Sequence, residues 1–331
     1  MVTPQTNITL EEAARLLPAF HSYAICGHVN PDGDCIGSQL ALAHALRLMG
    51  KEVVCLLAAP DSVPHNLGFL PGVQDLVAGE SCDFVPECFV GVDVPTAERL
   101  GGAKQVLDKT QVSFTIDHHA SESTYAKHVY VDPSSPSASM LVWKLIELMG
   151  AQNADSALCV MTGLITDTGR FANQNTTPES LRVAADLMDR GANPSAISRE
   201  IFQSRRLASL KLEGVMLAHM NIEEDGAFAW SYLTNEDFVS CDAVKADSEP
   251  FVGTLRSIEG VRVALILKEN DEGTVRGSLR AKDDTNVALV AESYGGGGHK
   301  AAAGFTFEGS LDDALAQVPA RVREFCFGKE A

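Results

Sequence analysis

The sequence predicts an α/β fold, with a doubly wound parallel sheet and a smaller α+β domain joined to it by a helical linker. In the first half, short and almost continuously apolar runs, typical of buried parallel strands, alternate with longer helical runs. In the last third, strand-like and helical runs are short and alternate less regularly. The length of 331 residues also fits about two domains.

The elements of the first half follow from these runs and from their capping residues. The expected strands are residues 21–27, 51–59, 87–94 and 110–117, and the expected helices are residues 36–50, 137–150, 154–169 and 177–191. Gly50, Gly150 and Gly191 stand where three of the helices end, as helix-terminating glycines do. Thr177 and Pro178 form a typical helix start.

The composition changes near residue 192. Residues 192–222 are helical, richer in Arg and Lys, and show no strand pattern, so they predict a linker. The elements expected after it are strands at 226–233, 261–269 and 274–282 and helices at 286–296 and 310–325. The predicted organisation is a first domain over 1–191, a helical linker over 192–225 and a second domain over 226–331.

The net charge of −18 restricts the class of partner. Proteins that track long nucleic acids usually carry a basic face, and this chain cannot be basic overall. We therefore expect an anionic substrate to be small, or to be held by metal ions and a few Arg or Lys side chains, and we expect no long duplex as a partner.

The eight cysteines form no C-x-x-C pair, and several lie in apolar runs, such as Cys55 and Cys159. This usage predicts buried thiols in the reducing cytoplasm and not a disulfide framework. The N-terminal residues lack a basic stretch followed by an apolar one, so we expect no signal peptide. No apolar run approaches the ~20 residues of a membrane helix.

The stretch HVNPDGDCIGS at residues 28–38 carries His28, Asp32 and Asp34 directly after the first predicted strand. Asn, Pro, Asp and Gly are ordinary turn residues, so a turn alone could explain it. In an open parallel sheet, however, ligands bind beyond the carboxyl ends of the strands. Further Asp and His residues follow the other predicted strands and one apolar helix: Asp93, Asp117, His118, His119 and Asp167.

These residues suit a pair of metal ions. Burying a lone carboxylate such as Asp167 after an apolar helix would be costly unless it binds a cation. Mixed carboxylate and imidazole ligands suit Mn²⁺, with Mg²⁺, Co²⁺ or Zn²⁺ as substitutes. Six ligands are too many for one ion with an open position, whereas two ions ~3.5–4 Å apart can share a carboxylate. No cysteine joins the set, which argues against a structural zinc site. The six candidate ligands are His28, Asp32, Asp34, Asp93, His118 and Asp167.

Five motifs occur in a familiar order: HVNPDGD, VDV, DHH, TDTG and, in the second domain, GGGGHKAAAG at residues 295–304. In this order and spacing they resemble the DHH/DHHA1 family of phosphoesterases over nearly the whole chain. The two-domain size most resembles the NrnA-type subfamily of bifunctional oligoribonucleases and 3′-phosphoadenosine 5′-phosphate (pAp) phosphatases. The resemblance implies a DHH catalytic domain, a helical linker and a DHHA1 substrate-binding domain, and it is compatible with a homodimer.

The resemblance also implies roles for the candidate residues. His28 and Asp32 match ligands of a first ion, Asp34, His118 and Asp167 match ligands of a second ion, and Asp93 matches the carboxylate that bridges them. Asp117 would orient a histidine, as carboxylates behind metal sites do. His119 would face the scissile phosphate and stabilise charge or protonate the leaving oxygen. A plain structural hydrogen bond is the alternative for His119.

The glycine-rich motif of the second domain predicts a substrate-binding turn. Glycines let the backbone approach a ligand and point N–H groups at an anion, and a guanidinium suits phosphate. A flexible loop and a solvated arginine are the alternatives. The resemblance implies that a terminal phosphate or base of the substrate is held by Arg280, Gly296, Gly297, Gly298 and His299.

The expected function is therefore a metal-dependent hydrolase of short RNA or DNA oligonucleotides and nucleoside bisphosphates, in which two metals activate water. It would cleave nanoRNA and pApA-type dinucleotides and remove the 3′-phosphate of pAp. Which of these substrates it prefers, RNA or DNA, and from which end it cuts, stay open. The alternatives are a manganese-dependent inorganic pyrophosphatase, against which GGGGHKAAAG argues, and a non-catalytic nucleotide-binding regulator, against which the complete ligand set argues.

Overall fold

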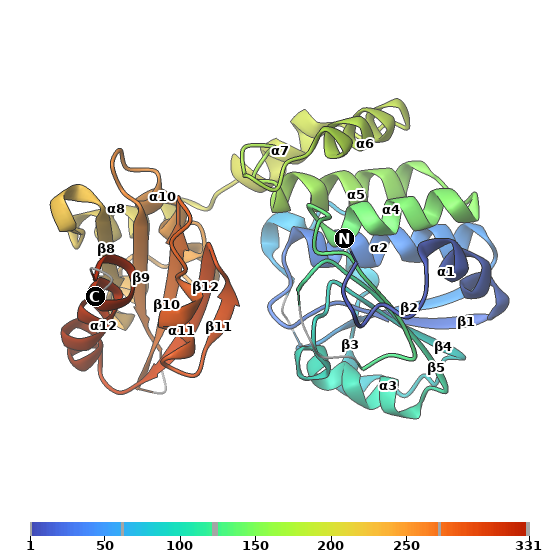
Figure 1. The fold of residues 1–331 in the computed structure, drawn as a ribbon, viewed down its shortest axis with the longest axis horizontal. Helices are drawn as coiled ribbons and strands as arrows, with labels where there is room; N and C mark the ends of the chain where they lie inside the picture. Colours follow the sequence, from blue (N-terminus) through green and yellow to red (C-terminus); the bar gives the residue numbers. More distant parts are fainter. Residues whose placement is uncertain (1, 61–62, 121–124, 271–272, 329–331) are drawn as a thin grey trace. The chain divides into compact units, whose positions relative to one another are not determined.

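The computed structural model describes residues 2–60, 63–120, 125–270 and 273–328. The chain divides into two compact units between Ser204 and Arg205 (Figure 1). Each unit has its own six-stranded sheet, parallel in the first unit and mixed in the second. The predicted α/β class, with a parallel-sheet domain followed by a smaller α+β domain, is confirmed.

The sheet of the first unit has the strand order β3-β2-β1-β4-β5-β6, and all of its strands are parallel. The chain runs outward from β1 to β3 and then returns to place β4 on the other side of β1. The carboxyl ends of β1 and β4 therefore flank the point where the strand order reverses, the usual ligand position in such sheets. The strands are β1 (Ser22–Cys26), β2 (Glu52–Leu57), β3 (Val77–Ala78), β4 (Cys88–Val92), β5 (Val112–Asp117) and β6 (His128–Val131).

Helices cover both faces of this sheet, as a doubly wound fold requires (Figure 1). On one face, α2 packs against the strands and is covered in turn by α4 and α5, so that it is apolar on nearly all sides. On the other face, α3 and the short helical turns before it pack on Ala24, Cys26 and Phe89. The helices are α1 (Leu10–Leu16), α2 (Gly33–Leu48), α3 (Lys104–Lys109), α4 (Ala138–Met149), α5 (Ala154–Asp167), α6 (Pro178–Asp189) and α7 (Pro194–Phe202).

The sheet of the second unit has the order β11-β12-β10-β9-β8-β7. Only β8 and β9 run parallel, and the other neighbours are antiparallel. The strands are β7 (Asn221–Glu223), β8 (Phe228–Leu233), β9 (Val263–Glu269), β10 (Thr274–Ala281), β11 (Gly297–His299) and β12 (Ala302–Glu308). The helices are α8 (Leu207–Ala218), α9 (Asn235–Ser240), α10 (Phe251–Arg256), α11 (Ala288–Glu292) and α12 (Leu311–Phe327). Helices α8–α10 pack on one face of the sheet and α11 and α12 on the other.

The segment expected to be a helical linker is shared between the two units. Helix α7 belongs to the first unit and packs against α5, whereas α8 belongs to the second and packs against β8. Residues 221–223, within a stretch that showed no strand pattern, form β7 because they pair with β8. Within the described residues, every helix is too short or too polar to cross a membrane.

Candidate metal centre

The predicted site residues of the first unit gather at the carboxyl edge of its sheet. His28 lies two residues beyond β1, Asp93 directly follows β4, and Asp117 is the last residue of β5. Asp93 has φ = 58° and Asn30 has φ = 53°. Asn and Asp tolerate this left-handed conformation better than other residues with side chains, and such positions cluster at functional sites.

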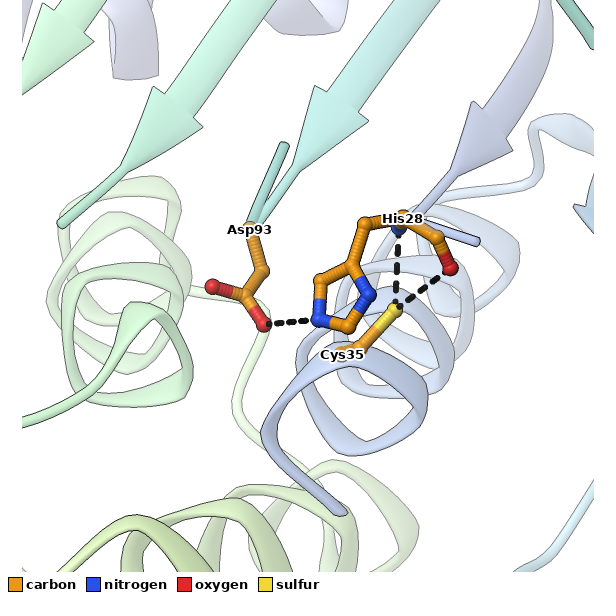
Figure 2. Close-up of side chains that lie close together, drawn as sticks. All are labelled: His28, Cys35 and Asp93. Carbon is orange, nitrogen blue, oxygen red and sulfur yellow. Dashed lines mark hydrogen bonds and ion pairs between the residues drawn. The ribbon is translucent and has the colours of Figure 1, made fainter. Parts of the chain in front are cut away.

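His28 and Asp93 meet across the point where the strand order reverses. The His28 Nε2 atom lies 3.4 Å from Asp93 Oδ2, and both side chains are buried (Figure 2). His28 Nδ1 lies 2.8 Å from the carbonyl oxygen of Val29. A carbonyl can only accept, so Nδ1 carries the proton of the neutral ring and Nε2 presents a lone pair. His28 is thus oriented as a metal ligand would be.

His118 stands among three carboxylates. Its Nε2 atom lies 3.5 Å from Asp93 Oδ1, 3.9 Å from Asp34 Oδ2 and 3.9 Å from Asp167 Oδ2. These separations exceed a normal hydrogen bond, so the nitrogen faces several oxygens without closing on any of them. The Nδ1 atom lies 3.3 Å from the carbonyl oxygen of Ser135, which again directs Nε2 into the group. One imidazole and three carboxylates in this arrangement fit a cation.

Asp34 is fixed in place by the start of α4. Its Oδ2 accepts the N–H of Ala138 at 2.6 Å, and its Oδ1 accepts the N–H of Ser139 at 2.9 Å. The N-terminus of a helix favours a carboxylate there. Gly163 of α5 leaves space for this carboxylate, because a Cβ at that position would lie 2.7 Å from Asp34 Oδ1. This carboxylate is therefore positioned by two helices.

The resemblance implied that Asp32 is a ligand of the first ion, but the surroundings of Asp32 differ from those of the other candidate ligands. It is exposed, and its Oδ1 accepts the N–H groups of Asp34 and Cys35 at 3.0 Å each, so that it caps α2. The structure does not bring it into the ligand groups formed by the other five candidates. Its role as a ligand of the first ion stays a prediction.

Asp117 organises the two histidines that follow it. Its Oδ1 accepts the N–H of His118 at 2.7 Å and lies 2.8 Å from Nδ1 of His119. Asp117 is buried, and it therefore holds the His119 ring in one orientation beside Asp93, whose Oδ1 lies 3.4 Å from the same Nδ1. This arrangement fits the expected orienting role of Asp117.

The electrostatics of the group favour a bound cation. Burial, and then the charge of Asp93, raise the pKa of Asp34 to about 7, and burial with the charge of Asp34 raises the pKa of Asp167 to about 8. Burial alone would raise the pKa of Asp93, but contact with His118 and His28 brings it below its usual range. Burial opposes the charged form of His28, but Asp93 raises the pKa of this imidazole to about 9. Buried carboxylates that suppress one another's ionisation would be relieved by a divalent ion.

One buried carboxylate oxygen also favours a bound cation. Asp93 Oδ1 is buried and has no hydrogen-bond partner among the residues that the structure describes. A buried acceptor left in this way is costly unless it binds a water or an ion.

Within the described parts of the chain, three groups of side chains could each hold a metal ion, and their ligand atoms lie within 4.8 Å of one another. Asp93 belongs to two groups and His118 to two, so the groups form one continuous centre. Cys35 is the member that the sequence reasoning left out. The groups are His28, Cys35 and Asp93; Asp93, His118 and His119; and Asp34, His118 and Asp167.

The predicted substrate-binding residues lie in the second unit. Arg280 is on β10, where burial and then the neighbouring charge of Arg256 lower the pKa of its guanidinium. The expected glycine turn contains an extended edge strand, since residues 297–299 form β11 beside β12. Gly298 has φ = 147°, and a Cβ there would lie 2.5 Å from a carbonyl oxygen. Gly296 is similarly tight against β12, and the side chain of His299 lies outside the described part of the chain.

The chain belongs to the DHH family. The DHH family N-terminal domain matches residues 22–164, and the DHHA1 domain matches residues 237–324. The resemblance seen in the motifs is therefore confirmed, and each domain falls within one of the two units.

The sequences of known relatives align with nearly the full length of this chain. The chain is 34% identical over 304 residues to the bifunctional oligoribonuclease and PAP phosphatase NrnA of Thermus thermophilus, covering 91% of this chain and 89% of that protein. It is 26% identical to the protein of the same name from Bacillus subtilis, covering 88% and 91%. The crystal structure of an exopolyphosphatase-related protein from Bacteroides fragilis superposes with a TM-score of 0.89 at 27% identity, covering 97% of each chain.

Proposed function

We propose that this protein is a metal-dependent phosphoesterase that hydrolyses very short oligonucleotides, including pApA-type dinucleotides, to mononucleotides and removes the 3′-phosphate of pAp. Membership of the DHH family and the names of the relatives support the reaction class. We also propose that it works in the cytoplasm, since all eight cysteines are free thiols.

The observation that carries the proposal is the shared position of Asp93. Its Oδ2 faces His28 at 3.4 Å, and its Oδ1 faces His118 at 3.5 Å. One carboxylate with a different imidazole on each oxygen is suited to bridge two ions. The six proposed ligands are those that the sequence predicted, His28, Asp32, Asp34, Asp93, His118 and Asp167. Their mixture of oxygen and imidazole donors suits Mn²⁺, with Mg²⁺ or Co²⁺ as substitutes.

When bound, two such cations would supply Lewis acidity, which activates water and neutralises charge on the phosphoryl oxygens. The chain's own residues would act on the leaving oxygen. Asp117 holds His119 through Nδ1, so its Nε2 is the nitrogen that would face the leaving oxygen. In its protonated form, His119 would stabilise the developing charge or give its Nε2 proton to that oxygen.

The second unit would bind the other end of the substrate. Burial and then the charge of Arg256 lower the pKa of the Arg280 guanidinium, and a bound anion would offset both effects. We therefore propose that Arg280, Gly296, Gly297, Gly298 and His299 hold a terminal phosphate or base. Arg256, the last residue of α10, is an addition to this set.

A substrate panel tests the proposal. Dinucleotides, oligomers of increasing length, pAp and pyrophosphate would be incubated with Mn²⁺ or Mg²⁺, and released mononucleotide and phosphate measured. We expect hydrolysis of the shortest oligomers and of pAp, with a steep loss of rate as length increases. Equal rates on short and long oligomers would contradict the length preference. Fast phosphate release from pyrophosphate alone would favour the pyrophosphatase alternative, and no turnover despite metal binding would favour the regulator.

A further inference from the structure

Cys35 lies against the proposed position of the first ion. It is in the first turn of α2 and is fully buried. Its Sγ atom lies within 4.8 Å of a His28 ring nitrogen and an Asp93 carboxylate oxygen (Figure 2). Among the described residues, it is the one cysteine that belongs to such a group. The ligand set predicted from the sequence contains no sulfur atom.

The hydrogen bonds of this sulfur are those of an acceptor. Sγ accepts the backbone N–H of His28 at 3.1 Å, whereas the thiol reaches an acceptor, the carbonyl of His28, only across 3.8 Å. By comparison, the thiol of Cys26 donates to the carbonyl of Gly27 at 3.1 Å. A backbone N–H pointing at sulfur stabilises electron density on it, as a metal-bound thiolate requires.

The neighbouring backbone is shaped around the sulfur. A Cβ at Gly27 would lie 2.1 Å from Cys35 Sγ, so any other residue at position 27 would collide with it. Asp93, the third member of the group, is 1% exposed and turns its Oδ2 to His28 Nε2 at 3.4 Å, whereas its Oδ1, without a hydrogen-bond partner among the described residues, faces His118. The sulfur, the imidazole and this carboxylate come from three separate segments and converge in one buried place.

We propose that Cys35 is a sulfur ligand of the cation held by His28 and Asp93, and that it gives this position a preference for Zn²⁺ and Co²⁺ over Mn²⁺. The inference rests on the proposed metal centre and adds a donor to it. Thiolates favour softer cations than carboxylates do. As the S–metal bond forms, the S–H bond breaks and the proton leaves to solvent, so no oxidant or reductant is needed.

The test uses the full chain loaded with Co²⁺ and, separately, with Zn²⁺. We expect a near-ultraviolet thiolate-to-Co²⁺ charge-transfer band to rise together with the visible Co²⁺ absorption. X-ray absorption at the zinc edge should show a sulfur neighbour at ~2.3 Å besides nitrogen and oxygen neighbours at ~2.0–2.1 Å. Cys35→Ser should remove both signals and weaken Zn²⁺ binding at least tenfold or so, as losing a ligand does more than losing an outer partner, with a smaller effect on Mn²⁺.

Cys26→Ala is the matched control, because Cys26 is equally buried but belongs to none of the ligand groups. It should keep the band and the sulfur neighbour. Visible Co²⁺ absorption without a charge-transfer band in the wild-type chain would overturn the sulfur ligand and leave the metal centre standing. No Co²⁺ or Zn²⁺ binding at all would overturn both. If Cys35→Ser does not fold, the wild-type spectra still decide.

Discussion

Asp117 Oδ1 lies 2.8 Å from Nδ1 of His119 and at the same time accepts the backbone N–H of His118 at 2.7 Å. One buried carboxylate thus sets the direction of two neighbouring histidines. His118 turns its Nε2 toward Asp34, Asp93 and Asp167, while His119 is held by Asp117. Three consecutive residues therefore have three separate proposed roles.

The first prediction concerns this pair. We expect His119→Gln to lower kcat for pAp about 10²–10⁴-fold, the usual contribution of a general acid. Asp117→Asn should lower kcat by a similar factor, because an amide does not hold the imidazole in the same way. Since the two residues act as a unit, the double variant should lose little more than either single variant. The measurement is a double-mutant cycle on kcat at saturating Mn²⁺.

Asp108→Asn is the control for that cycle, because Asp108 is exposed and pairs with Lys104 on the surface of α3. It should leave kcat unchanged. Full additivity of His119→Gln and Asp117→Asn would show that the hydrogen bond between them does not matter for the reaction.

The second prediction concerns metal removal. Burial and the charges of neighbouring carboxylates raise the pKa values of Asp34 and Asp167, and a divalent cation would relieve this. Mn²⁺ at about 100 times its dissociation constant should stabilise the fold by roughly 2.7 kcal/mol, which is about 5–10 °C in Tm for a unit of this size. The check is calorimetry with Mn²⁺ and after chelation, with Asp93→Asn alongside. That variant should lose most of the Mn²⁺ effect, and an undiminished shift would contradict its bridging position.

Much of the first unit could be predicted because its central strands are long apolar runs. β1, β2, β4 and β5 were expected within a few residues of their bounds. β6 was missed, since it is short and only half of its residues are buried. β12 was also missed, because its first residues are Ala and Gly, which favour strands poorly, and pairing with β10 makes it a strand.

The site was predictable to the extent that it depends on strand ends. Because parallel strands end at one edge, His28, Asp93 and His118 could be grouped from the sequence alone. The helix cap that Asp32 makes and the inward position of Cys35 could not be predicted in this way. Where α2 begins decides that Asp32 caps the helix and that Cys35 turns inward, and a helix start is uncertain by a residue or two from sequence.

The third prediction uses two helical glycines. In α5, a Cβ at Gly163 would lie 2.5 Å from Ser139 Oγ and 2.7 Å from Asp34 Oδ1. Gly163→Ala should therefore displace the Asp34 carboxylate, weaken Mn²⁺ binding and destabilise the fold by about 1–3 kcal/mol. In α8, a Cβ at Gly214 would meet no described atom within 4 Å outside its own helix, so Gly214→Ala should stabilise the fold by roughly 0.5–1 kcal/mol. Denaturant unfolding and Mn²⁺ titration of both variants give the answer. Unchanged Mn²⁺ affinity in Gly163→Ala would show that Asp34 is not a ligand.

The fourth prediction separates binding from stability at Arg280. Its guanidinium is half-buried, and the like charge of Arg256 disfavours its charged form, so this side chain lowers the stability of the substrate-free protein. Arg280→Met keeps much of the volume and removes the charge, so Tm should stay the same or rise. A charge-assisted hydrogen bond contributes about 1.5–3 kcal/mol, so KM for pAp should rise roughly 10–100-fold, with a smaller change in kcat. Arg321→Met, on the surface of α12 beside Glu324, is the control and should change neither. A fall in Tm at constant KM would make Arg280 a structural residue, since only a substrate contact predicts weaker binding from a fold that is no less stable.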